Sequence, residues 1–546
     1  MKTKLSLSII LLTMFFIFEK MNAQAPSWGW VKSAGGITSD EGYGITTDAS
    51  GNVLVTGVIN SPSITFGAIT LTNAGSYDFF VAKYDASGNV LWAKSAGGIN
   101  SDYGTGITTD ASGNVLVTGV FNSPSITFGT ITLSNGGLSD IFVVKYDASG
   151  NVLWAKSAGG ASYEGGTGIS TDATGNVLVT GFFQSDSIAF GTTTLTNAGA
   201  VNFFVVKYDT SGNILWAKSA GGSDYDYGHG ISTDASGNVL VAGEFASPSI
   251  TFGTTTLTNA GNQDIFITKC DTLGNILWAK SAGGTKNDVG YSISSDASGN
   301  VLVTGIFYSP FITFATTTLT NSGYNDIFIV KYDVSGNVLW AKSAGGTYFD
   351  ESYGICTDAS GNVLLTGYFS SDSITFGTTT LTNVGTTATA DIFIVKYDAS
   401  GNVQWAKSEG EPDNDVGYSA STDPGGNVVI TGSFASPTIT FGTTTLTNAG
   451  VTDIFVAKLD NTTGISELNS TADGVSIYPN PSTGQITITS SKIIDDVTIT
   501  NPLGQVIYQS KPKDKNLSLK IKDDGIYFVT ITSDKKTSTR KIIVQH

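Results

Sequence analysis

The most regular candidates for chemistry in this sequence are carboxylates at one position in each of seven repeated units. They are Asp40, Asp102, Glu164, Asp226, Asp288, Asp350 and Asp415. Because carboxylate oxygens attract cations and bind Ca²⁺, a ring of seven such groups could form a metal site. A carboxylate can also accept hydrogen bonds from the backbone N–H groups of its own loop. We favour this structural cap, since structural devices repeat in every unit whereas binding sites usually break the symmetry.

Tyrosines lie close to these carboxylates, in the most variable stretch of each unit, and their rings could stack on a sugar or on a protein partner. They are Tyr43, Tyr103, Tyr163, Tyr225, Tyr227, Tyr291, Tyr348, Tyr353 and Tyr418. Packing within the loops is an equally good interpretation of these residues, and the sequence favours neither.

Residues for other common chemistries are scarce, because the sequence has only two His, two Cys and one Arg. His229 lies in one variable loop and His546 is the last residue, which leaves little for a Ser-His-Asp triad or a zinc site. Cys270 and Cys356 fall in inequivalent strands of different units, so no disulfide is predicted between them. We predict no catalytic residue and no cofactor, with Ca²⁺ at the carboxylates as the alternative.

The protein is accordingly predicted not to be an enzyme. A catalytic pair needs two carboxylates in different environments, and seven near-equivalent groups do not provide them. The alternative is a carboxylate-based glycosidase or lyase. Glu164 is the only Glu in the set, and the loop 409–416 is the most divergent, so such an activity would centre there.

Composition narrows the class of protein further. The 546 residues carry a formal net charge of −17 and a single Arg, so no nucleic-acid partner is expected. Hydrophobic residues make up 40% of the chain and aromatic residues 11%, which argues against disorder. The 66 Gly, together with few strong helix formers, predict an all-β fold with many tight turns.

A repeat of 62 residues organises the middle of the sequence. Trp30, Trp92 and Trp154 mark its first copies, and the later copies carry the same Trp. Tight Asp-x-x-Gly-Asn turns are expected to join strands in pairs. The second strand of each unit is apolar on both faces, as expected for a sheet packed between two others. In one unit the four predicted strands are Ile169–Asp172, Asn176–Phe182, Phe203–Asp209 and Asn213–Ser219.

The ends of the repeat predict a closed ring. A Trp strand at 28–36 precedes the first complete unit, and the last unit reaches Asp460 without one. The N-terminal strand would complete the last blade and leave no unpaired edge. We therefore predict an all-β, seven-bladed β-propeller over residues 24–466. Its tight turns would share one face. The variable loops, and a long connection expected to form a hairpin, would share the other, where binding residues are expected.

The repeated stretches also carry a family resemblance. Residues Asp102–Gly119 follow the pattern D-x-G-x-G-I-x-T-D-A-S-G-N-V-L-V-T-G, which recurs with small changes in the other units. These units resemble the family of seven-bladed β-propeller repeats called SBBP repeats, over about residues 26–466. The resemblance implies the propeller fold and no particular biochemical role.

The first 23 residues are typical of a signal peptide. Lys2 and Lys4 precede an apolar run, Leu5–Phe18, and the small residue Ala23 follows. The apolar run has 14 residues and is too short to span a bilayer as a stable helix. We predict cleavage after Ala23 and no transmembrane segment in the mature chain.

Residues 467–546 form a second predicted domain, a small Ig-like β-sandwich, because apolar positions alternate between Pro and Gly turns. A Y-P-N-P-x-x-G motif consists of Tyr478, Pro479, Asn480, Pro481 and Gly484, and a Lys-rich end follows the strand at 525–531. This tail resembles the type A C-terminal sorting domain of the type IX secretion system of Bacteroidota. The resemblance implies passage through the periplasm, the type IX machinery as a partner, and release or attachment at the outer membrane surface.

These features together predict an extracellular or outer-membrane-surface protein of a binding or adhesion type. Its ligand would be a glycan or a surface protein held at the variable face of the propeller. The alternatives are the enzyme described above and a passive surface-structural protein whose repeats provide only rigidity.

Overall fold

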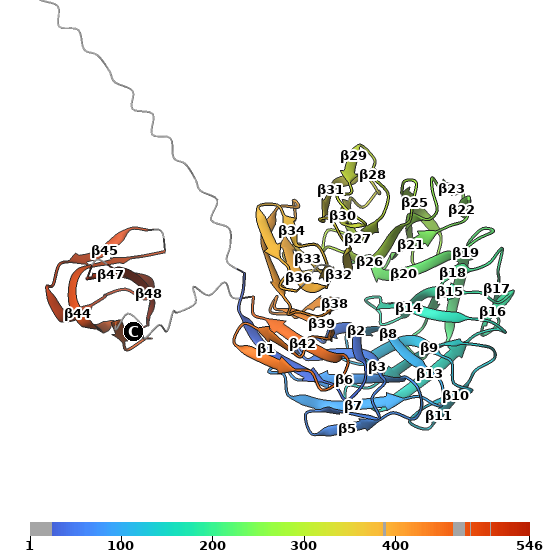
Figure 1. Cartoon of the computed structure of the whole chain (residues 1–546), viewed down its shortest axis with the longest axis horizontal. Coiled ribbons are helices and arrows are strands. Elements are labelled where there is room, and N and C mark those ends of the chain that lie inside the picture. Colours follow the sequence, from blue (N-terminus) through green and yellow to red (C-terminus); the bar gives the residue numbers. More distant parts are fainter. Residues whose placement is uncertain are drawn as a thin grey trace, which may run out of the picture. The chain divides into compact units, whose positions relative to one another are not determined.

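The strands and turns of the chain are seen in a computed structural model that describes residues 25–385, 389–461, 475–480, 482–502, 504–534 and 536–545. The chain divides into two units, Met1–Asn461 and Thr462–His546. The predicted signal peptide, residues 1–23, lies outside the described residues. Every element of the described residues is a β-strand, so the predicted all-β fold is confirmed (Figure 1). No helix long and apolar enough to cross a membrane occurs in that part of the chain.

The described residues of the first unit form seven four-stranded antiparallel sheets, called blades I to VII here. From the inner strand outward, blade I is β2 (Asp40–Thr47), β3 (Val53–Ile59), β6 (Asp78–Tyr84) and β7 (Val90–Ala96). Blades II to VI repeat this order: β8 (Asp102–Thr109), β9 (Val115–Phe121), β12 (Asp140–Tyr146) and β13 (Val152–Ala158); β14 (Glu164–Thr171), β15 (Val177–Phe183), β18 (Asn202–Tyr208) and β19 (Ile214–Ala220); β20 (Asp226–Thr233), β21 (Val239–Phe245), β24 (Asp264–Cys270) and β25 (Ile276–Ala282); β26 (Asp288–Ser295), β27 (Val301–Phe307), β30 (Asp326–Tyr332) and β31 (Val338–Ala344); β32 (Asp350–Thr357), β33 (Val363–Phe369), β36 (Asp391–Tyr397) and β37 (Val403–Glu409). Blade VII is β38 (Asp415–Thr422), β39 (Val428–Phe434), β42 (Asp453–Leu459) and β1 (Trp28–Ala34).

The long connection between the second and third strands of every blade folds into a two-stranded hairpin, as predicted. In the first of these hairpins Ile64 and Phe66 are buried, while Ser63 and Thr65 between them are exposed, so one face packs on the blade. The hairpins are β4 (Ser63–Phe66) with β5 (Ile69–Thr72), β10 (Ser125–Phe128) with β11 (Ile131–Ser134), β16 (Ser187–Phe190) with β17 (Thr193–Thr196), β22 (Ser249–Phe252) with β23 (Thr255–Thr258), β28 (Phe311–Phe314) with β29 (Thr317–Thr320), β34 (Ser373–Phe376) with β35 (Thr379–Thr382), and β40 (Thr438–Phe441) with β41 (Thr444–Thr447).

The tight turns form, as predicted, because Asp and Asn side chains form hydrogen bonds within the turn and Gly adopts a positive φ. In blade I, Asp48 accepts hydrogen bonds from the backbone N–H of Ser50 at 2.9 Å and from the side-chain amide of Asn52 at 2.8 Å. Gly51 has a φ of 76°, which glycine adopts at little cost. The two tight turns of each blade lie at the same end of its strands. We call this end the turn face and the opposite end the loop face.

The inner strands are longer than predicted. In blade III the inner strand begins at Glu164, five residues before the predicted start at Ile169. A β-bulge between Gly166 and Gly168 allows the pairing with β15 to continue past the glycines. The seven carboxylates are therefore the first residues of the inner strands at the loop face, and not loop residues.

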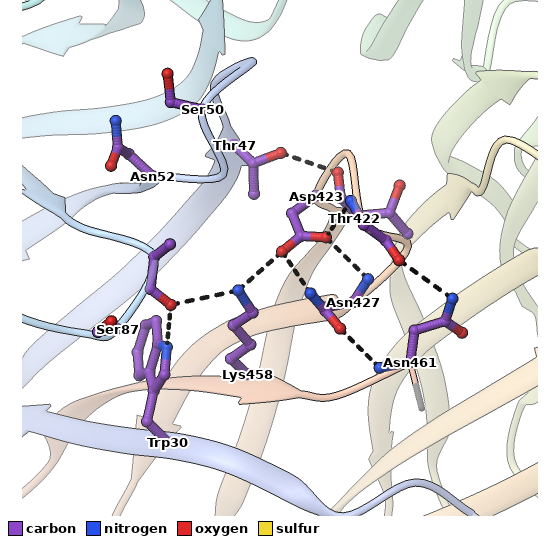
Figure 2. Close-up of polar contacts among 12 residues, drawn as sticks. Trp30, Thr47, Ser50, Asn52, Ser87, Thr422, Asp423, Asn427, Lys458 and Asn461 are labelled. Atoms are coloured by element: carbon purple, nitrogen blue, oxygen red, sulfur yellow. Dashed lines mark hydrogen bonds and ion pairs between the residues drawn. The ribbon is translucent and has the colours of Figure 1, made fainter. Parts of the chain in front are cut away.

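The inner strands close into a ring through hydrogen bonds near the turn face. The last Thr or Ser of each inner strand donates its hydroxyl to the equivalent carbonyl of the preceding blade, at 2.9–3.1 Å. Thr47 of blade I donates to Thr422 of blade VII, so the circuit is closed (Figures 1 and 2). Strand β1 pairs with β42 and completes blade VII, as predicted from the first Trp. The seven donors are Thr47, Thr109, Thr171, Thr233, Ser295, Thr357 and Thr422.

The hydrophobic core lies between neighbouring blades. Phe79 of blade I, for example, packs in one cluster with Val117 and Phe142 of blade II. The second strand of blade I, Val53–Ile59, is buried along its whole length because each of its faces contacts other apolar side chains. This arrangement explains why the second strand of each unit is apolar on both faces.

A buried Lys–Asp pair, called the clamp here, holds the turn face of each blade. At the ring closure Lys458 lies 2.8 Å from Asp423 and also donates to the carbonyl of Ala86 in blade I at 3.3 Å. The indole N–H of Trp30 donates to the same carbonyl at 3.0 Å, so this clamp joins blade VII to blade I (Figure 2). The other clamps, all at 2.8–2.9 Å, are Lys83–Asp48, Lys145–Asp110, Lys207–Asp172, Lys269–Asp234, Lys331–Asp296 and Lys396–Asp358.

The second unit contains one six-stranded sheet in its described residues. Its longest strand, β44, pairs with four others and buries alternate residues such as Ile486 and Ile488 in a core of its own. The Ig-like form of this unit stays a prediction. The strands are β43 (Val475–Tyr478), β44 (Gln485–Thr500), β45 (Val506–Ser510), β46 (Asp514–Lys520), β47 (Gly525–Ser533) and β48 (Lys536–Val544).

Candidate functional site

The seven carboxylates act as hydrogen-bond acceptors at the loop face. Asp40 accepts from the backbone N–H groups of Asn60 and Ser61 through one oxygen, at 2.9 and 3.0 Å. Its other oxygen accepts from the N–H of Gly36 at 2.9 Å and from the Ser61 hydroxyl at 2.7 Å. Each carboxylate thereby ties the loop before its strand to the segment after the second strand. All seven residues, Asp40, Asp102, Glu164, Asp226, Asp288, Asp350 and Asp415, are fully buried.

This geometry supports the cap interpretation over the Ca²⁺ interpretation. The oxygens that a cation would need already accept N–H and O–H groups, and the blade III residue Glu164 does the same from Gly160 and Ser185. Among the described residues, no three side chains of His, Cys, Asp or Glu lie close enough together to hold a metal ion.

A second set of loop-face carboxylates was missed in the sequence. These residues begin the third strand of each blade, and in blade I this residue is Asp78. One oxygen of Asp78 is buried without a hydrogen-bond partner, and burial, with Asp102 nearby, raises the pKa of Asp78 to about 6. Blade III carries the neutral Asn202 at this position. The other members are Asp140, Asp264, Asp326, Asp391 and Asp453.

The feature that breaks the repeat symmetry lies midway along the inner strands. In every blade a β-bulge leaves one residue of the inner strand unpaired, between the two paired residues that flank it. Bulges re-aim a side chain and are often found beside functional sites. The scaffold is the same in all seven blades, but the bulge residue differs: it is Tyr43, Thr105, Thr167, His229, Tyr291, Tyr353 and Tyr418 in blades I to VII.

Five of these bulge residues form a continuous row of rings, called the aromatic band here. Ring centroids are 5.6 Å apart for His229 and Tyr291, and 5.2 Å for Tyr291 and Tyr353. The row continues to Tyr418 at 5.6 Å and to Tyr43 at 5.4 Å. All five side chains are half-buried, so part of each ring is open to solvent. The band therefore follows the inner strands of blades IV, V, VI, VII and I (Figure 1).

The band is interrupted at blades II and III. There the bulge residues are Thr105 and Thr167, whose hydroxyls donate to the carbonyls of Gly166 and Gly228 in the next blade, both at 2.6 Å. These threonines have no aromatic ring on which a ligand could stack, and their hydroxyls are already hydrogen-bonded to the backbone. The centre of the ring is consequently aromatic on one side and aliphatic and polar on the other.

Three glutamates adjoin the aromatic band. Glu351 accepts from the hydroxyl of Tyr353 at 2.6 Å and from the amide of Asn325 at 3.1 Å. Glu41 accepts from Tyr418 at 3.3 Å. Burial, reinforced by these carboxylates, raises the pKa of Tyr353 and of Tyr418, so both phenols keep their protons and remain donors.

The third glutamate has a different partner. Glu244 lies 3.6 Å from Nε2 of His229, and these two buried atoms have no hydrogen-bond partner. Burial, reinforced by the carboxylates of Glu351 and Glu244, raises the pKa of Tyr291. The three glutamates therefore sit in unequal surroundings, and none of them pairs with a Lys or Arg in the part of the chain that the structure describes.

The structure separates the tyrosines named from the sequence into two groups. Tyr43, Tyr291, Tyr353 and Tyr418 join the band, whereas Tyr103 stacks on Tyr77 outside it. Tyr227 is not a bulge residue but stacks on His229, with ring centroids 6.2 Å apart, whereas Tyr348 contacts Tyr324. Sequence reasoning missed Glu41, Glu244 and Glu351; a signal was available at Glu244, an acidic residue in a strand that is otherwise apolar.

The sorting motif lies at one edge of the second unit. The side chain of Asn480 donates to the carbonyl of Lys541 and accepts from the N–H of Ile543, both at 2.9 Å. Gly484 has a φ of 97°, and its carbonyl accepts from the N–H of Ile521 at 2.8 Å. Tyr478 is about half exposed and Pro479 follows it. Pro481 lies outside the described residues.

Residues 476–545 match the family of secretion system C-terminal sorting domains. The chain thus carries a type IX sorting domain, which implies contact with the type IX machinery and export to the cell surface or the extracellular space. The predicted sorting tail is confirmed in this respect.

Three known proteins are similar to large parts of the chain. An uncharacterized WD repeat-containing protein of Acanthamoeba polyphaga mimivirus is 26% identical over 507 residues, which is 76% of this chain and 36% of the relative. The chain thus spans about a third of that relative. A solved gluconolactonase from Xanthomonas campestris is 10% identical, with a TM-score of 0.30, covering 65% of this chain and 86% of that one. A Synechocystis apocarotenoid oxygenase is 12% identical, with a TM-score of 0.35, covering 79% and 93%.

The equivalence of the repeats led to the prediction that the protein is not an enzyme, and this prediction is wrong. Two of the similar solved structures, the gluconolactonase and the apocarotenoid oxygenase, are enzymes. The prediction rested on seven equivalent carboxylates. Glu244 and Glu351, which it did not consider, have different partners and supply the inequality that the caps lack.

Proposed function

We propose that the protein is a surface-displayed binding protein whose propeller holds a glycan at the aromatic band. The observation that carries this proposal is the unbroken row from His229 to Tyr43, because it occupies only part of an otherwise repeated ring. Tyrosine rings stack on the apolar faces of sugars, and carboxylates accept hydrogen bonds from sugar hydroxyls. A surface protein as ligand is an outcome of the test described below.

The chain organisation belongs to the same proposal. Residues 1–23 would be removed as a signal peptide, residues 24–466 would form the SBBP-type seven-bladed propeller, and residues 467–546 would direct export. A mature protein released into the medium or held at the outer membrane would present the band to the surroundings. Deletion of residues 467–546 should leave the protein in the periplasm; normal surface delivery of the truncated chain would contradict the sorting role.

The binding proposal is tested by screening the mature full-length protein against a glycan array and extracted surface proteins. The double variant Tyr291→Thr, Tyr353→Thr places in blades V and VI the residue that blades II and III already carry. We expect it to fold and to lose at least tenfold in affinity for any glycan that the native protein retains. Tyr103→Thr, which alters a tyrosine outside the band, is the matched control and should bind normally.

Two results would contradict the proposal. One is equal loss of affinity in the control and in the double variant, since the band would then have no special part. The other is binding of no glycan by a folded, monodisperse native protein. If the native protein binds a surface protein through the same residues, the ligand is a protein and not a glycan. If neither screen detects binding, the passive structural role is favoured.

Glycan cleavage is a second candidate function, and the unequal glutamates favour it. Glycoside hydrolysis uses two carboxyl groups in different protonation states, which requires different surroundings. Glu244 faces His229, whereas Glu351 accepts from Tyr353 and Asn325. A glycan identified in the screen should be incubated with native protein and with Glu244→Gln and Glu351→Gln. Cleavage that both variants lose would establish the activity, and binding without cleavage would leave the first proposal alone.

A further inference from the structure

A Trp–Tyr pair, with its rings stacked or tilted by up to 37°, joins neighbouring blades at five places around the ring. The Trp lies on the outer strand of one blade and the Tyr on the third strand of the next, with ring centroids 6.0–6.3 Å apart. Each Trp also donates its indole N–H to a backbone carbonyl of that next blade. The five pairs are Trp30–Tyr84, Trp92–Tyr146, Trp154–Tyr208, Trp278–Tyr332 and Trp340–Tyr397.

The pair is incomplete between blades III and IV. Trp216 donates to the carbonyl of Thr272 like its counterparts, but Cys270 occupies the position of the Tyr. The backbone there is unchanged, because Cys270 pairs with Val239 and Ile276 as Tyr84 pairs with Val53 and Val90. The chain therefore keeps the Trp and its setting and removes only the ring that covers it.

Blade VII also lacks the Tyr, but its position is filled differently. There Leu459 takes the place of the Tyr beside Trp405, and Ala25 and Trp28 from the N-terminal segment pack against the same cluster. No comparable cover is present beside Cys270 in the described residues of blades III and IV. The gap beside Trp216 is thus particular to one blade junction.

A cavity of about 450 Å³ opens at this gap. It is lined by Trp216, Phe252, Cys270 and Leu277, and the exposed Lys218 stands at its edge. The matching crevice between blades I and II has a volume of about 280 Å³, and there Tyr146 forms part of the wall while Trp92 does not. The missing ring accounts for the larger cavity and for the access to the indole face.

We propose that this cavity binds a small aromatic carboxylate, with its ring on Trp216 and its acid group at Lys218. The aromatic ring is inferred from the five equivalent junctions, where a Tyr ring lies beside the Trp with centroids 6.0–6.3 Å apart. The acid group is inferred from charge complementarity, since Lys218 forms no ion pair within the described residues. A volume of this size suits a compact molecule rather than a peptide segment.

The proposal is tested with phenylacetate as the probe and the full mature chain as the protein. Saturation-transfer NMR and the shift in melting temperature should both report binding, since a ligand that binds only the folded state stabilises it. Cyclohexylacetate, which lacks the aromatic ring, should bind at least tenfold more weakly. Lys218→Met should weaken binding several-fold.

The decisive variant restores the Tyr that the other repeats carry at this position. Cys270→Tyr should abolish phenylacetate binding and raise the melting temperature of the free protein, because the new ring fills the cavity as it does at the other junctions. Cys356→Thr restores the repeat at the other cysteine and should bind phenylacetate normally. Should Cys270→Tyr fail to fold, Cys270→Leu is the substitute, because the chain already carries Leu459 at that position.

The outcomes are distinct. Undiminished binding by folded Cys270→Tyr, or by Cys270→Leu in its place, would overturn the proposal, as would equal binding of phenylacetate and cyclohexylacetate. The absence of any binding to folded native protein at millimolar phenylacetate would overturn it as well. None of these results depends on the aromatic band, so this proposal and the glycan proposal fail separately.

Discussion

The two faces of the propeller use aspartate in opposite ways. At the turn face each Asp of the first tight turn meets a buried Lys at 2.8–2.9 Å. Burial alone would raise the pKa of Asp296, but hydrogen bonds from Asn300 and Lys331 lower it below its usual value. At the loop face Asp264 forms no ion pair within the described residues, and burial raises its pKa to about 6. One residue type is therefore a firmly ionised anchor on one face and a group that takes up a proton near pH 6 on the other.

This difference indicates which face holds the blades together and which face tolerates sequence variation. Five of the clamp lysines also donate to a backbone carbonyl of the next blade, and all the clamps rely on charges that stay ionised at neutral pH. The loop face instead relies on caps and on carboxylates that are easily neutralised. The aromatic band lies between the two faces, where the bulge residue changes without disturbing either system.

The largest expected effect comes from breaking one clamp. Lys331→Met keeps the aliphatic stem but leaves Asp296 buried without its counter-ion, and loss of one partner of a buried pair costs about 3–5 kcal/mol. Denaturant unfolding at pH 7 should show this loss. Lys342→Met, on the exposed outer strand of the same blade, should change the free energy of unfolding by less than about 0.5 kcal/mol. Equal effects would remove the distinction between the faces.

The free energy of unfolding should pass through a maximum near pH 4. The raised carboxyls bind a proton more tightly when folded, so their contribution is complete below pH 4 and is lost as the pH rises through about 6. One carboxyl raised by two pKa units corresponds to about 3 kcal/mol. The lowered turn-face carboxyls act in reverse: they stabilise above pH 4 and lose this effect as the pH falls. A flat profile between pH 5 and pH 8 would contradict the loop-face assignment. The carboxyls raised to about 6 at the start of the third strands are Asp78, Asp264, Asp326, Asp391 and Asp453.

A smaller effect of opposite sign is expected from one neutral replacement. Blade III already carries Asn202 where blade IV has Asp264, and its amide can donate to Asn197 and accept from Ala198. Asp264→Asn should therefore stabilise the protein by about 1–2 kcal/mol at pH 8 and leave it unchanged at pH 4. Asp296→Asn at the turn face should destabilise at pH 8. If both substitutions shift stability in the same direction, the two faces do not differ as described.

No effect is expected from removing divalent cations. The seven carboxylates at the start of the inner strands already accept hydrogen bonds from N–H and O–H groups, so EDTA should leave the melting temperature of the mature protein unchanged. Addition of millimolar Ca²⁺ after dialysis is the complementary measurement. A fall with EDTA that Ca²⁺ reverses would restore the metal interpretation for these residues.

Local chemistry made much of this molecule predictable from its sequence. The Asp-x-x-Gly-Asn turns and the apolar second strands predicted four-stranded blades, because turn formation and strand burial follow from the residue types within each repeat. The displaced first Trp predicted closure by strand β1, because the last repeat lacks its own fourth strand and would otherwise have an unpaired edge. The clamp lysine was not recognised from the sequence. Its ion-pair partner is an Asp of a tight turn elsewhere in the repeat, and only the fold places that turn against the strand.

The aromatic band and the cavity beside Trp216 were decided only by the tertiary structure. Tyr43 and Tyr418 are far apart in the sequence and become neighbours because the ring closes. Likewise Cys270 looks like an ordinary substitution in one repeat, and only the fold shows that Trp216 of the preceding blade lies beside it. A repeated sequence determines its scaffold through contacts that recur within each unit and between equivalent neighbours. The two candidate binding sites lie where units with different side chains contact one another, and those contacts depend on how the whole ring is assembled.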